Sequence, residues 1–94
     1  MDRFNELNAF IALVEAGGFT AAARRTGDSQ SAISKTIGAL ERRLGVALFN
    51  RSTRSVTLTD QGQRYYDRAK PLLDEMEDAD SELTSSTHDV SGLL

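Results

Sequence analysis

The sequence predicts a mainly α-helical fold with one small β-hairpin and a long final helix, on three observations. Helix-forming segments before residue 45 each end at a glycine. Two short runs of extended character flank residues 50–54, as in a hairpin. From residue 65 onward, apolar residues alternate at spacings of four and three, the pattern of a helix that packs along its length.

Composition limits the kind of protein. A chain of 94 residues has room for one small domain, and 39% apolar content supports a modest core rather than an enclosed substrate cavity. The chain has no cysteine, which excludes disulfides and thiolate metal sites. No apolar run approaches the roughly 18 residues of a membrane span, and the first residues do not resemble a signal peptide. We therefore expect a soluble, cytoplasmic protein.

Residues suited to catalysis are scarce. His88 is the only histidine and lies in a polar segment, so one chain can form neither a Ser-His-Asp triad nor a histidine metal cluster. Carboxylate pairs such as Asp74 and Asp78 occur at helical spacing, but on an exposed helix such pairs are usually a solvated face. No glycine-rich phosphate loop is present. The sequence thus predicts no catalytic residue and no metal, and argues against an enzyme.

The net charge of -3 hides an uneven distribution. Residues 24–54 carry seven basic and two acidic side chains, a local charge of +5, whereas residues 57–94 carry three basic and nine acidic ones, a local charge of -6. A polyanion senses charge within a Debye length of roughly 8–10 Å, so a distant acidic segment does not have to cancel a basic one. Charge alone fits a nucleic-acid surface and two solvated faces of opposite sign equally well.

Two helices are predicted in the first 25 residues. The first spans residues 4–16 and ends at Gly17. Thr20 is a good N-cap for a short second helix through Arg25, and Phe19 before it can act as a hydrophobic staple. The first helix has apolar side chains at helical spacing at Phe4, Leu7, Phe10, Ile11 and Val14.

A third helix is predicted from a cap at Ser29 to a stop at Gly45. Its apolar stripe consists of Ile33, Ile37, Leu40 and Leu44. The tight, glycine-containing segment 26–29 joins it to the second helix, as is typical of a helix-turn-helix. A helical hairpin built only for packing is the alternative, but the polar start of the third helix argues against it. Small hydrogen-bonding groups there can reach base edges in the major groove of DNA.

Residues 46–49 and 55–58 are predicted as two strands, the second with Val56 and Leu58 facing inward. The turn between them is a predicted wing over residues 50–55. It carries arginines beside hydroxyl groups, which suits contacts with phosphates and insertion into a narrow minor groove. An ordinary surface turn is the alternative. Together with the three helices, the hairpin predicts a winged helix-turn-helix domain over residues 1–59.

Thr59 is the predicted N-cap of a linker helix over residues 60–88. No other helix in so short a chain is long enough to cover its heptad seam, so we expect a homodimer through this helix. An amphipathic helix folded back on its own domain is the alternative. Residues 89–94 are predicted as the start of a hinge. The predicted dimer interface consists of Tyr65, Ala69, Leu72, Met76, Ala79 and Leu83.

Five linked motifs cover almost the whole chain. They are Ala21-Ala22-Ala23-Arg24-Arg25, Ser29-Gln30-Ser31-Ala32-Ile33-Ser34-Lys35, Leu40-Glu41-Arg42-Arg43-Leu44-Gly45-Val46, Leu48-Phe49-Asn50-Arg51 and Thr57-Leu58-Thr59-Asp60-Gln61-Gly62. This set resembles the N-terminal DNA-binding domain and linker helix of a LysR-type transcriptional regulator. The resemblance implies sequence-specific binding of double-stranded promoter or operator DNA by a homodimer that regulates transcription, with a tetramer as a further assembly of the full-length protein.

The same resemblance implies a C-terminal effector-binding domain of the periplasmic-binding-protein type. Family members enter that domain through a segment similar to residues 91–94, so this chain is expected to stop where the domain would begin. A small-molecule effector would bind in that absent domain. No cofactor is expected within residues 1–94.

Roles carry over by position from the family. The recognition helix, residues 30–44, would lie in the major groove, where Gln30 can pair with adenine and Lys35 with guanine or a phosphate. Ser31 and Ser34 match the other two base-reading positions. Phosphate or minor-groove contacts are expected from Thr20, Ser29, Arg51, Thr53 and Arg54, with Arg54 in the minor groove.

Two positions depart from the family's pattern, which usually has aliphatic residues there. Thr26 gives up part of a core contact, and Asp28 places a negative charge near the expected DNA surface. Asp28 either caps the recognition helix, or it weakens DNA affinity or rejects certain phosphate positions.

An alternative function for the whole chain is a protein-interaction module in which the winged domain binds protein and the tail only dimerises. A DNA complex that is lost steeply with added salt would favour the nucleic-acid interpretation.

Overall fold

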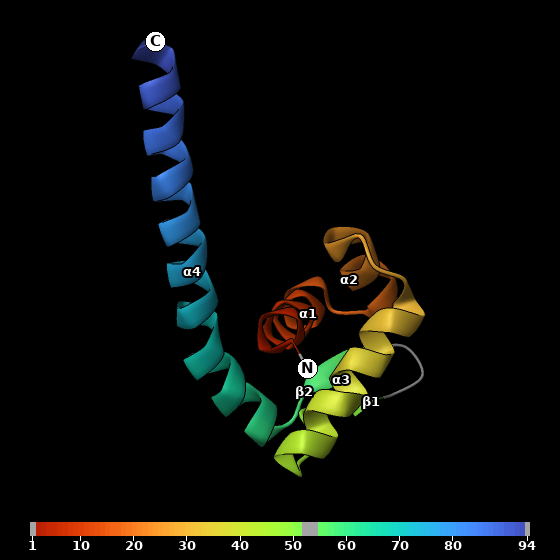
Figure 1. The fold of residues 1–94 in the computed structure, drawn as a ribbon. Coiled ribbons are helices and arrows are strands. Elements are labelled where there is room, and N and C mark those ends of the chain that lie inside the picture. Colours follow the sequence, from red (N-terminus) through yellow and green to blue (C-terminus); the bar gives the residue numbers. More distant parts are fainter. Residues whose placement is uncertain (1, 52–54, 94) are drawn as a thin grey trace.

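The computed structural model describes residues 2–51 and 55–93, with side chains through residue 84. Three short helices and a hairpin form one unit, and a long helix leaves it as a rod (Figure 1). The predicted class, mainly α with a small hairpin and a long final helix, is confirmed. The elements are α1 (Arg3–Ala16), α2 (Phe19–Thr26), α3 (Gln30–Leu44), β1 (Phe49–Arg51), β2 (Val56–Leu58) and α4 (Asp60–Leu93).

Short local signals place the helix ends. Asp2 caps α1, because its carboxylate accepts a hydrogen bond from the Asn5 amide at 3.1 Å. Ser29 caps α3 in the same way, accepting from the Ala32 amide at 3.0 Å. Gly27 after α2 has a φ of 82°, a left-handed conformation in which a side chain would be strained. This glycine turns the chain from α2 almost directly into α3, as the sequence predicts.

The predicted cap of α2 is wrong. The helix begins at Phe19, one residue before Thr20, because the Gly18 carbonyl already accepts a hydrogen bond from the Ala22 amide at 3.0 Å. Thr20 therefore lies within the first turn of α2, where its side chain is exposed.

The first strand is also predicted too early, since β1 begins at Phe49 rather than at Val46. The carboxylate of Glu41 on α3 accepts hydrogen bonds from the Leu48 amide (2.7 Å) and the Phe49 amide (3.2 Å), which ties this segment to α3. Only the residues from Phe49 onward pair with β2, in antiparallel register with Phe49 opposite Leu58.

The long helix extends further than predicted. It continues to Leu93, whereas the sequence predicts an end at residue 88 and a hinge from residue 89. Between Pro71 and Gly92 no glycine or proline interrupts it, and serine and threonine lower helix propensity by only a few tenths of a kcal/mol, roughly. A polar composition was therefore not enough to end the helix.

One apolar core unites the helices and the hairpin. The ring of Phe10 on α1 is fully buried, 5.4 Å from the ring of Phe49 on β1 and 5.0 Å, edge-on, from that of Tyr65 on α4. Through this side chain α1 contacts both the wing and α4. The other large side chains that are fully buried are Ile11, Leu13, Ile33, Ile37, Leu40 and Leu48.

The start of α4 lies directly against the chain that enters the wing. Thr59 caps the helix, accepting from the Gly62 amide at 3.0 Å and donating to the Ala47 carbonyl at 2.7 Å. Gly62 is buried, and a Cβ there would overlap the carbonyl oxygen of Leu48 and lie 2.8 Å from Cδ2 of Leu58. The absence of a side chain at residue 62 is what allows this close approach.

The two halves of α4 have different surroundings. The sequence predicts Tyr65 and Ala69 as dimer contacts; in the protomer Tyr65 packs on Phe10 and Ala69 is largely buried in the core, although both also line a groove at the surface. Leu73 is buried in the core as well. For this half the alternative of a helix folded back on its own domain holds.

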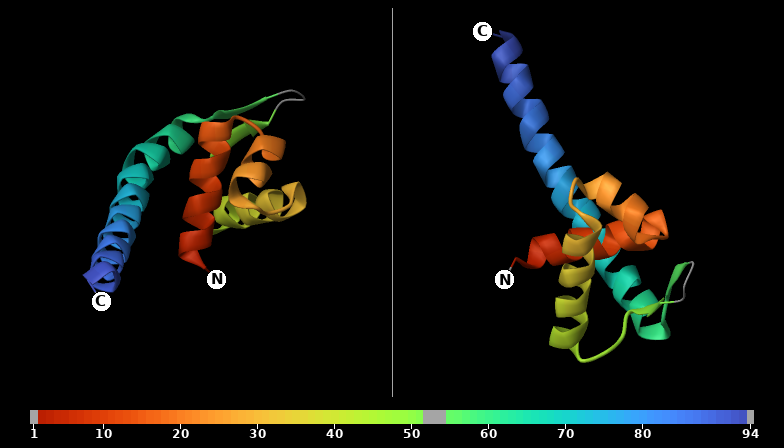
Figure 2. Two further views of the ribbon diagram at one scale, coloured as in Figure 1. Left: turned by 90° about the horizontal axis from the view of Figure 1, so that it is seen from above. Right: turned by 90° about the vertical axis from the view of Figure 1, so that its right-hand side faces the viewer.

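Beyond its first half, α4 projects away from the other helices (Figure 2). Three of the predicted seam residues are exposed, Leu72 (62%) beside the buried Leu73, and Met76 (48%) and Leu83 (71%) further along the helix. Ala79 is exposed between them. The seam is therefore most accessible from Leu72 onward.

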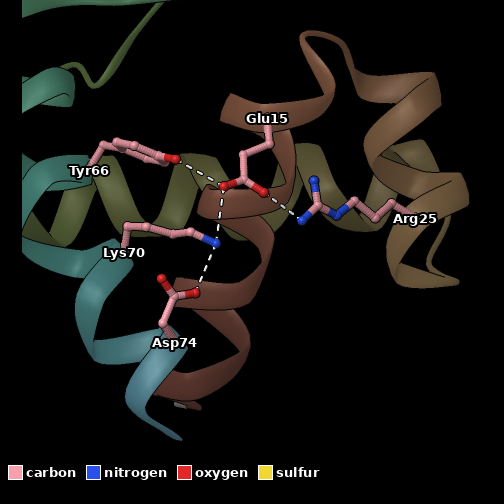
Figure 3. A network of polar contacts seen from close by, with 5 residues as sticks. All are labelled: Glu15, Arg25, Tyr66, Lys70 and Asp74. Atoms are coloured by element: carbon pink, nitrogen blue, oxygen red, sulfur yellow. Dashed lines mark hydrogen bonds and ion pairs between the residues drawn. The ribbon is translucent and has the colours of Figure 1, made fainter. Parts of the chain in front are cut away.

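A polar network joins α4 to α1 and α2 (Figure 3). Glu15 near the end of α1 accepts hydrogen bonds from Arg25 on α2 (2.5 Å) and from the Tyr66 hydroxyl on α4 (2.9 Å). Lys70 Nζ lies 3.2 Å from the same carboxylate and 3.0 Å from that of Asp74. Partial burial by itself would raise the pKa of Glu15, but the hydrogen bonds from the three donors outweigh it, so the pKa is lowered.

Because folding lowers the pKa of Glu15, its carboxylate should stabilise the fold fully at pH values above its ordinary pKa of 4.5. This stabilising contribution should be lost as the pH falls through the lower pKa that Glu15 has in the folded state. The unfolding free energy of the parent chain should exceed that of Glu15→Gln at about pH 7 and converge with it near pH 3, as measured by urea denaturation. A difference that stays constant between these pH values would rule out a charge contribution from Glu15.

Candidate nucleic-acid interface

α3 has a buried face and an opposite, outward face. The buried face is formed by Ile33, Ile37 and Leu40. Opposite them four residues recur at spacings of four, three and four, and we call them the outer stripe: Ser31, Lys35, Gly38 and Arg42. All four predicted base-reading residues are exposed: Ser31 and Lys35 lie in the outer stripe, and Gln30 and Ser34 lie beside it.

Arg42 is a candidate that the sequence interpretation missed. Its side chain is exposed, and its Nη1 atom lies 3.3 Å from where a Cβ on Gly38 would be, so the guanidinium folds over the glycine. With Arg51 it also lines an open hollow of about 480 Å³ between α3 and the wing. The signal was available, because Arg42 follows Lys35 by seven residues, two helical turns along the same face.

Several cations of the basic segment 24–54 are already paired with carboxylates. Arg43 lies 2.8 Å from Glu6, Arg51 lies 3.1 Å from Glu41, and Arg25 takes part in the network around Glu15. Within the described ranges, the cations of this segment without an ion pair are Arg24, Lys35 and Arg42. The uncompensated positive charge therefore lies on α2 and on the outer stripe of α3.

The wing lies beside α3 on the face turned to the viewer in the right-hand view of Figure 2. Arg51 at the end of β1 donates to Glu41 and lies over the ring of Phe19, 5.8 Å from its centroid. Its guanidinium thus holds the base of the wing to α2 and α3, a role that the sequence did not predict. The predicted contacts Thr53 and Arg54 fall outside the described residues.

The turn between α2 and α3 satisfies its own polar groups. The Thr26 hydroxyl donates to the Ala23 carbonyl (3.4 Å) and accepts from the Asp28 amide (3.3 Å). Because Ser29 is the N-cap of α3, the suggestion that Asp28 caps this helix is wrong. The Asp28 side chain is exposed at the start of the recognition helix, as is Ser29.

No three carboxylate, histidine or cysteine side chains lie close enough to hold a metal ion in the part of the chain that the structure describes. In the same part, none of the helices is both long and apolar enough to cross a membrane.

A three-helix unit with a tight glycine turn, an exposed polar face on its third helix and an adjoining two-stranded wing defines a winged helix-turn-helix domain. The family model described as bacterial regulatory helix-turn-helix protein, lysR family, matches residues 4–63. This chain therefore belongs to the LysR family, and it is the DNA-binding domain of a LysR-type transcriptional regulator.

Similar proteins agree with this assignment. The HTH-type transcriptional activator AaeR of Escherichia coli strain K12 is 42% identical over 94 residues, which cover all of this chain and 30% of that protein. The crystallised BenM DNA-binding domain on its benA site 1 DNA has a TM-score of 0.80 at 32% identity, covering 93% of this chain and 97% of that one. The CbnR DNA-binding domain in complex with DNA has a TM-score of 0.78 at 36% identity, covering 93% and 99%. The chain thus spans about a third of the length of the curated relative and nearly all of each crystallised domain.

Proposed function

We propose that this chain binds double-stranded DNA sequence-specifically as a homodimer and regulates transcription from the promoter it occupies. The observation that carries the proposal is the outward face of α3, where small polar side chains lie beside two cations, Lys35 and Arg42, that lack a counter-charge in the described residues. A helix of this width and chemistry fits the major groove. The similar BenM and CbnR domains were crystallised with DNA, which supports the same partner here.

The exposed residues divide by the kind of contact each can make. At the start of α3, Gln30, Ser31, Ser34 and Lys35 read base edges. Arg42, further along the helix beside the hollow that faces the wing, contacts backbone phosphates. Thr20 and Ser29 approach phosphates at the starts of α2 and α3. In the wing, Arg51 holds the base of the hairpin, and Thr53 and Arg54 contact phosphates or the minor groove.

Lys35→Ala and Arg42→Ala should have different effects on DNA binding. Loss of a base contact at Lys35 should weaken binding to the preferred sequence by roughly 1–3 kcal/mol and relax specificity. Loss of a phosphate contact at Arg42 should weaken binding to all DNA sequences to a similar extent. It should also reduce the slope of log affinity against log salt concentration by about one. Titrations of specific and random duplexes at several salt concentrations measure both effects.

Asp67→Asn is the control for this pair, because it alters an exposed charge on α4 outside the acidic segment 74–84. If both α3 variants bound specific and random DNA as tightly as the parent chain at every salt concentration, the α3 interface would be refuted. No DNA binding by the parent chain would favour the protein-interaction module instead.

The projecting part of α4 is the proposed dimer contact. Its exposed apolar residues lead into a groove of about 370 Å³ lined by apolar side chains and three arginines. These are Leu7, Leu44, Tyr65, Ala69 and Leu72, with Arg3, Arg43 and Arg68. A second copy of α4 is the occupant that best matches this surface in length and composition.

Charge favours an antiparallel pair. Residues 74–84 carry six acidic side chains and no basic one, so a parallel pair would set two acidic segments side by side. In an antiparallel pair the acidic segment of one chain instead meets the groove with its three arginines on the other. The seam numbering fits such a two-fold pair, since 72 with 76, 69 with 79 and 65 with 83 are all centred on residue 74.

The remaining roles belong to the longer protein implied by the curated relatives. We place DNA binding in residues 1–59, dimerisation in the helix that follows, and the binding of a small-molecule effector in a separate C-terminal domain. Further assembly into a tetramer would also involve that domain. A regulator that acts on promoter DNA works in the bacterial cytoplasm.

A further inference from the structure

We infer that Glu15 is a positioning residue that sets the spacing between the two DNA half-sites the dimer recognises. The inference rests on the proposed function, because it needs both α3 in the major groove and α4 in the dimer contact. It adds that the contacts of Glu15 fix the angle between α3 and α4.

The Glu15 carboxylate is the one group in the network that is bonded both to α2, which leads into α3, and to α4 (Figure 3). One oxygen accepts from Arg25, which lies four residues before the N-cap of the recognition helix. The other oxygen accepts from Tyr66 and lies 3.2 Å from Lys70, both on α4. A single side chain on α1 thus connects α2, which leads into the recognition helix, with the dimerisation helix.

The apolar contacts at the same junction do not fix an angle in this way. Ala69 and Leu73 attach α4 to α1 by burial, which is non-directional and allows small rotations at little cost. Hydrogen bonds to a carboxylate are directional, and those from charged donors are the stronger ones. The junction is therefore held together by apolar packing, the start of α4 is fixed by the bonds of Thr59 to the segment that enters the wing, and the network orients the helix further along its length.

A small rotation at this junction has a large effect at the DNA. Across a domain about 20 Å wide, a rotation of about 10° moves the recognition helix by about 3.5 Å, close to the 3.4 Å rise of one base pair. In a two-fold dimer both recognition helices move, so the change in separation is doubled. An unconstrained junction should thus accept several half-site spacings, and an oriented one should prefer a single spacing.

The test compares Glu15→Gln with the parent chain on duplexes whose two half-sites are separated by different numbers of base pairs. The substituted amide keeps the shape of the side chain but removes the charge that Arg25 and Lys70 share. We expect the parent chain to prefer one spacing, and this preference to fall by about fivefold or more in the variant. Affinity for a single isolated half-site should change by less than about twofold, because α3 itself is unaltered.

Asp67→Asn is the matched control, since it removes an exposed carboxylate from α4 that lies outside the network, the seam and the acidic segment 74–84. Tyr66→Phe and Lys70→Met each remove one donor from the network. If circular dichroism shows that Glu15→Gln does not fold, these two variants test the inference in its place. The inference is overturned if the folded network variants keep the spacing profile of Asp67→Asn. A parent chain that binds no DNA, or that stays monomeric, would refute the proposed function and the inference with it.

Discussion

Gly62→Ala is expected to destabilise the folded chain by about 3 kcal/mol or more, even though alanine is the better helix former. The new methyl group would overlap the Leu48 carbonyl oxygen and press on the Leu58 side chain. Backbone cannot move aside as a flexible side chain can, so relief requires α4 to shift away from the wing. Urea denaturation followed by circular dichroism measures the loss.

Gly38→Ala is the matched control, since it also adds one methyl group to a helix. There the new Cβ would lie 3.3 Å from Nη1 of Arg42, the far end of a flexible side chain that can move. We expect no destabilisation, and a gain of up to about 1 kcal/mol from helix propensity. Equal stability changes at the two glycines would show that the close approach at residue 62 is unimportant.

The double variant Leu72→Asp/Met76→Asp is expected to convert the dimer to a monomer, with a dissociation constant raised at least about 100-fold. Both side chains are exposed in the single chain, so the fold should be unaffected, whereas in the dimer the new carboxylates would be buried among apolar groups. Sedimentation velocity over a range of protein concentrations measures the change. Affinity for DNA with two half-sites should fall in parallel.

The orientation of the pair can be tested at the same positions. In the antiparallel register each residue 72 lies opposite the partner's residue 76, so Leu72→Asp/Met76→Lys should place unlike charges together and dimerise more tightly than the double aspartate variant. A parallel pair would place like charges together and predict no recovery. Ser81→Asp, on the other side of α4, should leave the dimer intact. A dimer that persists in the double aspartate variant would refute the proposed interface.

Most of the fold could be predicted because its signals are local. Ser29 and Thr59 cap helices through bonds to amides three residues away, and Gly27 closes α2 by its own conformation. The exposed reading face of α3 follows from the period of Ile33 and Ile37 in the same way. Each of these signals involves residues within one or two turns of each other.

Two of the errors, the division of the α4 seam and the start of β1, have the opposite character. The heptad spacing of α4 shows which side is apolar, but it does not show that Ala69 meets the protomer's own core while Leu72 is left exposed. The start of β1 was predicted too early because it depends on Glu41, whose bonds to Leu48 and Phe49 cross from one element to another. No periodicity marks such contacts.

The candidate site was likewise predictable only where its features depend on local sequence signals. Its exposed residues on α3 follow from the helical period and the motifs of the LysR family. The ion pair of Arg51 with Glu41 and the network around Glu15 could not be predicted, because the partners lie on different elements and are ten or more residues apart in the sequence.

The order of elements, most helix ends, the exposed face of α3 and the family therefore follow from the amino-acid sequence, since each rests on spacing or on bonds between near neighbours. The angle of α4, the division of its seam and the need for glycine at residue 62 came from the folded molecule alone. They depend on contacts such as that between Glu15 and Tyr66, 51 residues apart, which exist only once the helices have packed.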